Sequence, residues 1–179
     1  LAGYYTQILI EKNPLFSGII SPFFLEYIPG TWMPSIDISK GTASVMTGYE
    51  STTGQINIEL KKPENRDPLF LNLYQNTIGK TEGSLITSKQ INPQIHTMFL
   101  FYGAKSPKRL DANNDTFLDK PLQTNLNAMN RWSMQSEHTH IQFGLAFLHD
   151  HRDGGQTGFN FSDHMPTTDS YGFHNITSR

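Results

Sequence analysis

The chain has 179 residues, a formal net charge of −2 and no cysteine. A chain of this length can bury the core of one domain or of two small ones, and the lack of cysteine excludes disulfides and thiol chemistry. The chain has no excess of positive charge, so no nucleic-acid partner is expected. Charged residues make up only 17% of the sequence and aromatic residues 12%, which favours strands that have one wet face.

The beginning of the chain predicts a short buried strand and a turn. An apolar run at residues 8–10 precedes a polar segment that ends in proline, residues 11–14. The sequence opens at Leu1 without a methionine or a signal peptide. It stops within a strand-like pattern at residues 171–176, so we expect both ends to have been cut from a longer protein.

Residues 36–63 carry the most specific pattern. A short strand is expected around Ile36 and Ile38, and it ends in a turn at Lys40 and Gly41. Further glycine turns follow at Gly48 and Gly54, and glycine supplies the positive φ that such turns need. The strand expected next has two faces, formed by Ile56, Ile58 and Leu60 and by Asn57, Glu59 and Lys61.

Beyond a polar joint at residues 63–68, the chain becomes a succession of strand-length segments. The strands that we expect are residues 69–77, 81–90, 95–104, 124–134 and 140–150. Short connections at 92–93 and 135–139 alternate with long polar ones at 105–123 and 151–170. Short turns at one end and long loops at the other are typical of outer-membrane barrels.

The alternation within these segments predicts one apolar and one polar face. Leu69, Leu71 and Leu73 share a face of the first segment. In the last, Ile141, Phe143, Leu145 and Phe147 oppose Gln142, Gly144 and Ala146. One face could meet lipid and the other a polar lumen. Phe101, Tyr102 and Trp132 are candidates for the aromatic girdles at the membrane interfaces, with ordinary sheet packing as the alternative.

The pattern in residues 36–63 resembles the end of the plug domain of TonB-dependent outer-membrane receptors. The matching pieces are Lys40-Gly41, Ser44-Val45, Gly48-Tyr49 and the closing Gly54-x-Ile56-Asn57-Ile58. Plug domains also carry an Ile-Leu-Ile strand before an Asp-Gly-x-Pro turn, which residues 11–14 replace without a glycine. Asn13 is therefore expected to supply the left-handed geometry. Residues 111–121 and Asn130-Arg131-Trp132 are also similar to receptors of the Bacteroidetes type.

The resemblance implies a mainly β fold in which part of a plug domain precedes the first strands of a large outer-membrane β-barrel. Residues 1–62 would be the C-terminal half of the plug, 63–68 a linker, and 69–179 about the first five antiparallel strands. The implied protein lies in the bacterial outer membrane, in contact with the lipid bilayer. It imports a scarce nutrient, such as an iron chelate, haem or a vitamin, with energy from the TonB complex of the inner membrane. The segment that contacts TonB would lie upstream of Leu1.

A different class of protein is kept as the alternative, a soluble β-rich binding module with a calcium-binding loop. Asp111, Asn113, Asp115 and Asp119 occupy positions 1, 3, 5 and 9 of a loop, and hard cations bind several such oxygen ligands. Thr116 stands where an EF-hand has glycine, and Leu122 stands where it has glutamate. A solvated Asx-rich turn is the other interpretation of this loop. No enzyme is expected, because the sequence contains no recognised catalytic motif.

A pair of histidines is the candidate for contact with substrate. His149 and His151 fall on one face of an extended chain, where they could share a transition metal or touch a metal-chelate substrate. The alternative is a hydrated strand end. His138 and His140 have the same spacing but lie at an expected short turn, where contact with substrate is not expected.

Overall fold

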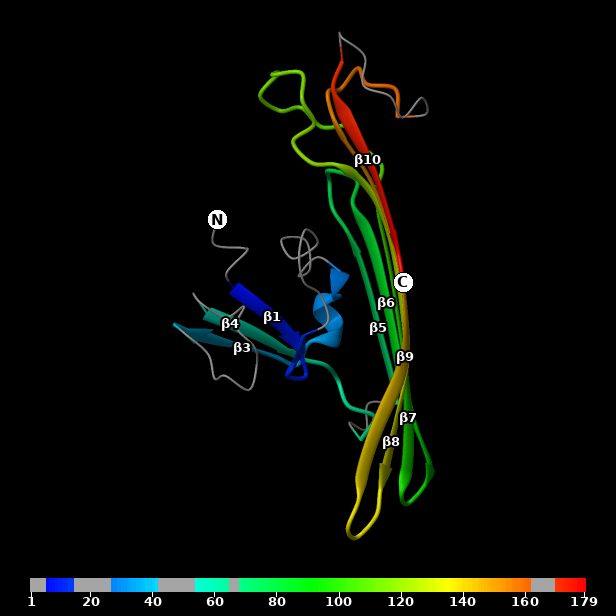
Figure 1. Cartoon of the computed structure of the whole chain (residues 1–179). Helices are drawn as coiled ribbons and strands as arrows, with labels where there is room; N and C mark the ends of the chain where they lie inside the picture. The colour runs from blue at the N-terminus through cyan, green and yellow to red at the C-terminus, as the bar shows by residue number, and fades with distance from the viewer. Residues whose placement is uncertain (1–5, 15–26, 42–53, 65–67, 162–169) are drawn as a thin grey trace. The chain divides into compact units, whose positions relative to one another are not determined.

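The computed structural model describes residues 6–14, 27–41, 54–64, 68–161 and 170–179. The chain divides into two units, Leu1–Lys62 and Pro63–Arg179, and each contains one sheet (Figure 1). Among the described residues, no helix is long and apolar enough to cross a membrane.

The first unit contains a mixed sheet with the strand order β2-β1-β4-β3. Its elements are β1 (Thr6–Ile10), β2 (Asn13–Pro14), the 3-10 helix η2 (Gly30–Trp32), β3 (Ser35–Lys40) and β4 (Gly54–Glu59). β4 pairs in parallel with β1 and antiparallel with β3. Ile56 therefore lies opposite both Ile8 and Ile38. Leu9 and Ile58 are buried almost completely and form part of the core.

The turn between β1 and β2 differs from the prediction made for Asn13. The residues with positive φ are Glu11, at 50°, and Lys12, at 66°. Ile10 pairs with Asn13, so only two residues close the hairpin, and the favoured two-residue turn needs positive φ at both of them. The Lys12 backbone N–H donates to Asn57 Oδ1 at 2.8 Å, and Asn13 Nδ2 donates to the Glu11 carbonyl at 3.0 Å. These bonds hold the turn without a glycine.

Two glycines of the 36–63 pattern have identifiable backbone roles. Gly41, with φ of +88°, follows the last residue of β3. Gly54 pairs with Lys40, and a Cβ at Gly54 would lie 2.7 Å from the Ser39 carbonyl oxygen. Side chains are therefore excluded at Gly54 by the close approach of β3. Gly48 lies outside the described residues.

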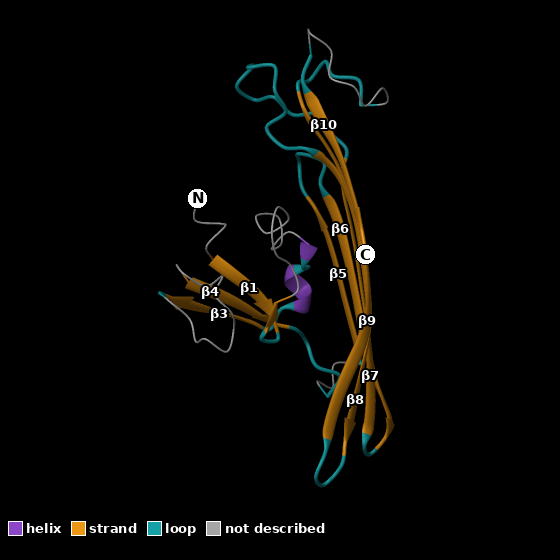
Figure 2. Ribbon diagram, viewed as in Figure 1, coloured by secondary structure: helices purple, strands orange, loops and turns teal. Residues whose placement is uncertain are grey.

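The second unit is a six-stranded antiparallel meander with the order β10-β9-β8-β7-β6-β5 (Figure 2). Its strands are β5 (Leu69–Gln75), β6 (Thr81–Asn92), β7 (Ile95–Ser106), β8 (Leu122–Gln135), β9 (His140–Gly155) and β10 (Gly172–Ser178). The predictions of a mainly β fold and of antiparallel strands at these places are confirmed. Among the described residues, β5 and β10 each pair on one side only.

β9 is longer than the sequence predicts. It continues beyond Asp150 to Gly155, so His151 and Asp153 belong to a strand and not to a loop. Asp153 pairs with Leu122 on one side and with His174 on the other. The two neighbouring strands provide hydrogen-bond partners for the backbone of this polar segment. Its local composition alone is typical of a loop.

The sheet of the second unit has the two faces that the alternation predicts. The apolar face carries Leu69, Leu71, Leu73, Leu85, Phe99, Phe101, Leu126, Ala128, Trp132, Met134, Ile141, Phe143, Leu145, Phe147 and Ile176. Leu145 illustrates its exposure, since 80% of its surface is accessible. The polar face carries Asn72, Ser84, Asn125, Asn127, Arg131, Ser133, Asp150 and Arg152, together with Met98 and Leu100.

The three aromatic candidates for a girdle lie on different faces. Phe101 and Trp132 are on the apolar face, whereas Tyr102 pairs with Asn127 on the polar face and cannot belong to a girdle. The Trp132 ring stacks on Phe143, with 6.2 Å between centroids. Its indole N–H donates to Asn130 Oδ1 at 2.5 Å, and Asn130 Nδ2 donates to the Met98 carbonyl at 3.2 Å. The polar groups here are therefore paired within the apolar face.

The connections differ in length between the two ends of the sheet. β6 and β7 are joined by Pro93 and Gln94, and β8 and β9 by residues 136–139. At the opposite end, residues 107–121 and 156–171 form long connections. Leu118 N donates to the Gly155 carbonyl and Thr157 N to the Thr116 carbonyl, both at 2.8 Å. The two long loops are thus bound to one another.

Candidate functional site

A charged hydrogen-bond network occupies the polar face where β8 meets β9. Asp150 is fully buried, with 0% of its surface exposed. Its Oδ1 accepts from Gln123 Nε2 at 2.9 Å and from Asn125 Nδ2 at 2.8 Å, and its Oδ2 accepts from Arg152 Nε at 2.5 Å. Asn127 Nδ2 donates to Asn125 Oδ1. Ligand pockets use a few such fixed polar groups to orient what they bind.

A second polar cluster holds the start of the second unit against the same face, near the short turns. The Glu64 carboxylate accepts hydrogen bonds from Ser133 Oγ and, at 3.3 Å, from Gln142 Nε2, and it lies 3.2 Å from His140 Nε2. Burial alone would raise the pKa of Glu64. The hydrogen bonds from Ser133, from its own backbone, from His140 and from Gln142 outweigh that effect and lower the pKa to about 2.

We expect this anchor to be lost in acid. The pKa of Glu64 in the folded protein is about 2, below its ordinary value of 4.5, so its contribution to stability is complete above pH 4.5 and disappears as the pH falls towards 2. A carboxyl-carbon NMR titration of the intact protein measures this pKa directly. Ser133→Ala should raise it towards the ordinary value because a donor is removed. Ser136→Ala is the control, since the contacts of the Glu64 carboxylate do not include Ser136, and the assignment fails if both variants titrate alike.

The Asp111 to Asp119 loop uses its side-chain oxygens to accept backbone N–H groups. Asp111 accepts from Asp115 N at 3.1 Å and from Thr116 N at 3.0 Å. Asp115 Oδ1 accepts from Phe117 N, Asp119 Oδ2 from Ala112 N, and Asn113 Oδ1 from Asp115 N. Thr116, where an EF-hand has glycine, takes the positive φ itself, at 71°. Asx turns thus organise the loop, and calcium binding by Asp111, Asn113, Asp115 and Asp119 stays a prediction.

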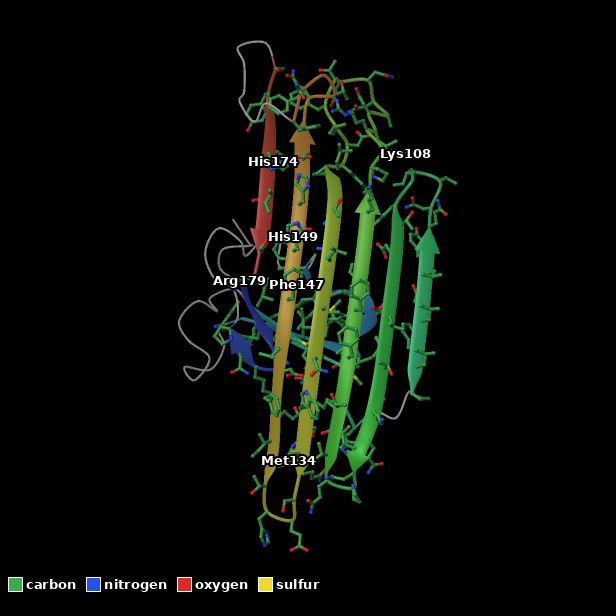
Figure 3. All side chains as sticks on the ribbon, turned by 90° about the vertical axis from the view of Figure 1, so that its right-hand side faces the viewer. Lys108, Met134, Phe147, His149, His174 and Arg179 are labelled. Atoms are coloured by element: carbon green, nitrogen blue, oxygen red, sulfur yellow. The ribbon has the colours of Figure 1, made fainter. Side chains whose placement is uncertain are left out.

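The two histidines proposed for substrate contact have different partners. His149 and His151 do share the apolar face of β9. His149 Nδ1 lies 2.9 Å from Ser178 Oγ on β10. His151 instead lies close to Asp153 and His174. Among the described residues, these three form the one group of three histidine or carboxylate side chains whose ligand atoms all lie within 4.8 Å of one another, as metal ligands do. Figure 3 shows His149 on β9 and His174 on the neighbouring strand β10.

The sequence pattern groups Asp153 with His149, Asp150 and His151 at the end of the fifth expected strand, but it does not single out His174. His174 belongs to the last predicted strand, but its partner depends on the register between β9 and β10, in which His174 lies opposite Asp153. No local pattern encodes that register. The local signal for such a site is the recurrence of titratable residues at every second position from 149 to 153, and it carries no information about the partner on β10.

Within the described part of the plug-like motif, Asn57 makes several hydrogen bonds through its side chain. It is buried in the middle of β4 and accepts the Lys12 backbone N–H. Its own Nδ2 donates to Glu59 Oε1 at 3.0 Å. Lys40 ends β3, and Ile56 lies between β1 and β3. The motif thus fixes the sheet and its turns, and these positions remain predictions as functional residues.

Comparisons with known proteins found similarity in structure only. No family model matches the sequence, and no curated protein matches it either. The fold is similar to that of the open form of the ferric-catecholate import receptor Fiu from E. coli K12, with a TM-score of 0.60 and 14% identity. The match covers 83% of this chain and 20% of that receptor, so this chain spans about a fifth of its length. The likeness shows a mainly β fold that is consistent with a plug followed by antiparallel barrel strands.

Proposed function

We propose that this chain is part of a TonB-dependent receptor of the bacterial outer membrane, which imports a scarce nutrient of the iron-chelate class. The observation that carries the proposal is the separation of apolar and polar side chains onto opposite faces of the six-stranded sheet. A monomeric soluble protein rarely exposes an apolar patch of this extent. A transmembrane barrel turns such a face towards lipid and the polar face towards its lumen.

The connections support the same orientation. The two long loops, which bind to one another, would lie outside the cell, and the short turns would lie in the periplasm. Glu64 is held near the short turns by Ser133 and Gln142, so the chain would enter the barrel from the periplasmic side. In the proposed receptor, further strands close the barrel, because an open sheet edge is not stable in lipid.

Single cysteines test the membrane location, since the chain has none of its own. Leu145→Cys places a thiol on the apolar face and Ala146→Cys places one on the polar face, one residue away. In intact outer membranes, a membrane-impermeant maleimide should modify Ala146→Cys and leave Leu145→Cys unmodified. A fluorophore attached at position 145 after solubilisation should be quenched by a lipid-soluble quencher once the protein is returned to vesicles.

Equal labelling at both positions, with no lipid quenching, would favour the soluble calcium-binding module. One specific observation favours that alternative, namely the many side-chain oxygen atoms in the loop from Asp111 to Asp119. It predicts that calcium increases the resistance of this loop to proteases and that Asp111→Ala abolishes the effect.

The transport half of the proposal is tested in cells that depend on this protein for iron. Uptake of a labelled ferric catecholate by the intact protein should require TonB. A ferric catecholate is chosen because the similar receptor imports ferric catecholates by name. Uptake that is unchanged in cells without TonB would exclude the energised mechanism. Labelling that shows lipid exposure without such uptake would point to another nutrient.

A further inference from the structure

We infer that His151, Asp153 and His174 form a binding site for a first-row divalent transition-metal ion of the zinc type. The three side chains come from neighbouring positions on two paired strands. Asp153 and His174 are directly opposite each other in the register, and His151 is two residues before Asp153 on β9. All three therefore project from the same face of the sheet.

The distances among the ligand atoms match the size of such an ion. His151 Nε2 lies 3.3 Å from His174 Nδ1 and 3.2 Å from Asp153 Oδ2. A tetrahedral zinc site with bonds of about 2.0–2.1 Å separates its ligands by about 3.3–3.4 Å. The remaining contact, His174 Nδ1 to Asp153 Oδ1, is a hydrogen bond of 2.6 Å. This hydrogen bond requires a proton on His174 Nδ1, which must move to Nε2 or be released before the Nδ1 lone pair can bind an ion.

The chemistry of the set is selective. Two imidazoles and one carboxylate suit zinc and its neighbours in the first transition row, whereas calcium and magnesium prefer oxygen ligands alone. The His151 and His174 rings meet edge to face, with 4.7 Å between centroids, and His151 Nε2 lies 3.3 Å from His174 Nδ1. A hydrogen bond between these nitrogens already requires a lone pair on one of them.

The site is partly shielded and has room for further ligands. The side chains of His151, Asp153 and His174 are 37%, 14% and 24% exposed. His151 and Asp153 line a cavity of about 200 Å³ whose wall includes Thr124, Leu122 and Lys105. Three protein ligands leave at least one coordination position open, as in zinc sites that keep a water molecule. The inference does not depend on the proposed function, because it is argued from the distances between side chains on β9 and β10 and not from a membrane location.

The experiment is a titration of the purified intact protein with Zn²⁺ alone, combined with the visible absorption of Co²⁺ as a reporter of nitrogen ligation. We expect one ion to bind per protein molecule. His174→Ala and Asp153→Asn should each weaken binding at least about tenfold, since even outer-shell partners contribute that much. His149→Ala is the matched control, because His149 lies on the same face of the same strand and contacts Ser178. That variant should bind as the unsubstituted protein does.

A rescue variant separates the loss of a ligand from the loss of the fold. His174→Cys supplies a thiolate, which zinc also accepts, and it should restore binding that His174→Ala removes. The inference is overturned if the unsubstituted protein binds no Zn²⁺. It is also overturned if His174→Ala binds as tightly as the unsubstituted protein, or if His149→Ala weakens binding as much as His174→Ala does.

Discussion

Replacing Leu145 by arginine should destabilise the folded protein in a membrane by about 2–4 kcal/mol, the cost of a charged side chain at the bilayer midplane on the outer face of a barrel. Leu145 is the most exposed large apolar residue described, at 80%, and its neighbours Phe143 and Phe147 lie on the same face. The guanidinium would have to reach the interface or bring water into the lipid. Urea unfolding in lipid vesicles, followed by tryptophan fluorescence, measures the change.

Ala146→Arg is the matched control. Ala146 also lies on β9 and is exposed, but it belongs to the polar face. An arginine there should change stability much less, because that face is proposed to line a polar lumen. If both arginines destabilise the protein equally, the apolar face does not meet lipid, and the membrane location proposed for this sheet is wrong.

Replacing Asp150 by alanine should have an effect of similar or greater size. The carboxylate is fully buried and accepts hydrogen bonds from Gln123, Asn125 and Arg152. Removing one partner of a buried ion pair typically costs about 3–5 kcal/mol, because the other charge stays buried without compensation. The same unfolding measurement applies, since this network lies within the second unit.

The double variant Asp150→Ala, Arg152→Met shows whether the buried charge is responsible. It removes both charges and keeps much of the apolar volume of the arginine stem, so it should be more stable than Asp150→Ala alone. If the double variant is instead as unstable as the sum of the two single variants, the two residues do not act as a pair. The loss would then come from the amide contacts of Gln123 and Asn125.

Local patterns in the sequence were sufficient for the strands of the second unit and for the assignment of their faces. Alternation with a period of two places Leu69, Leu71 and Leu73 on one face whatever the neighbouring strand is. Turn chemistry likewise marked the short connections, where Asn92 Oδ1 accepts the N–H groups of Gln94 and Ile95. These features depend only on residues close together in the chain, so they can be predicted from it.

The features that the sequence did not predict depend on partners far along the chain. The turn at Glu11 and Lys12 is held by Asn57 of another strand, which accepts the Lys12 N–H, and the extension of β9 to Gly155 is paired with both β8 and β10. The cluster of His151, Asp153 and His174 depends on the β9–β10 register, which places His174 opposite Asp153. Sequence by itself thus determined the strands and their two faces, because side-chain alternation is local. Only the tertiary structure decided which polar residues meet, because strand register is set by the whole sheet.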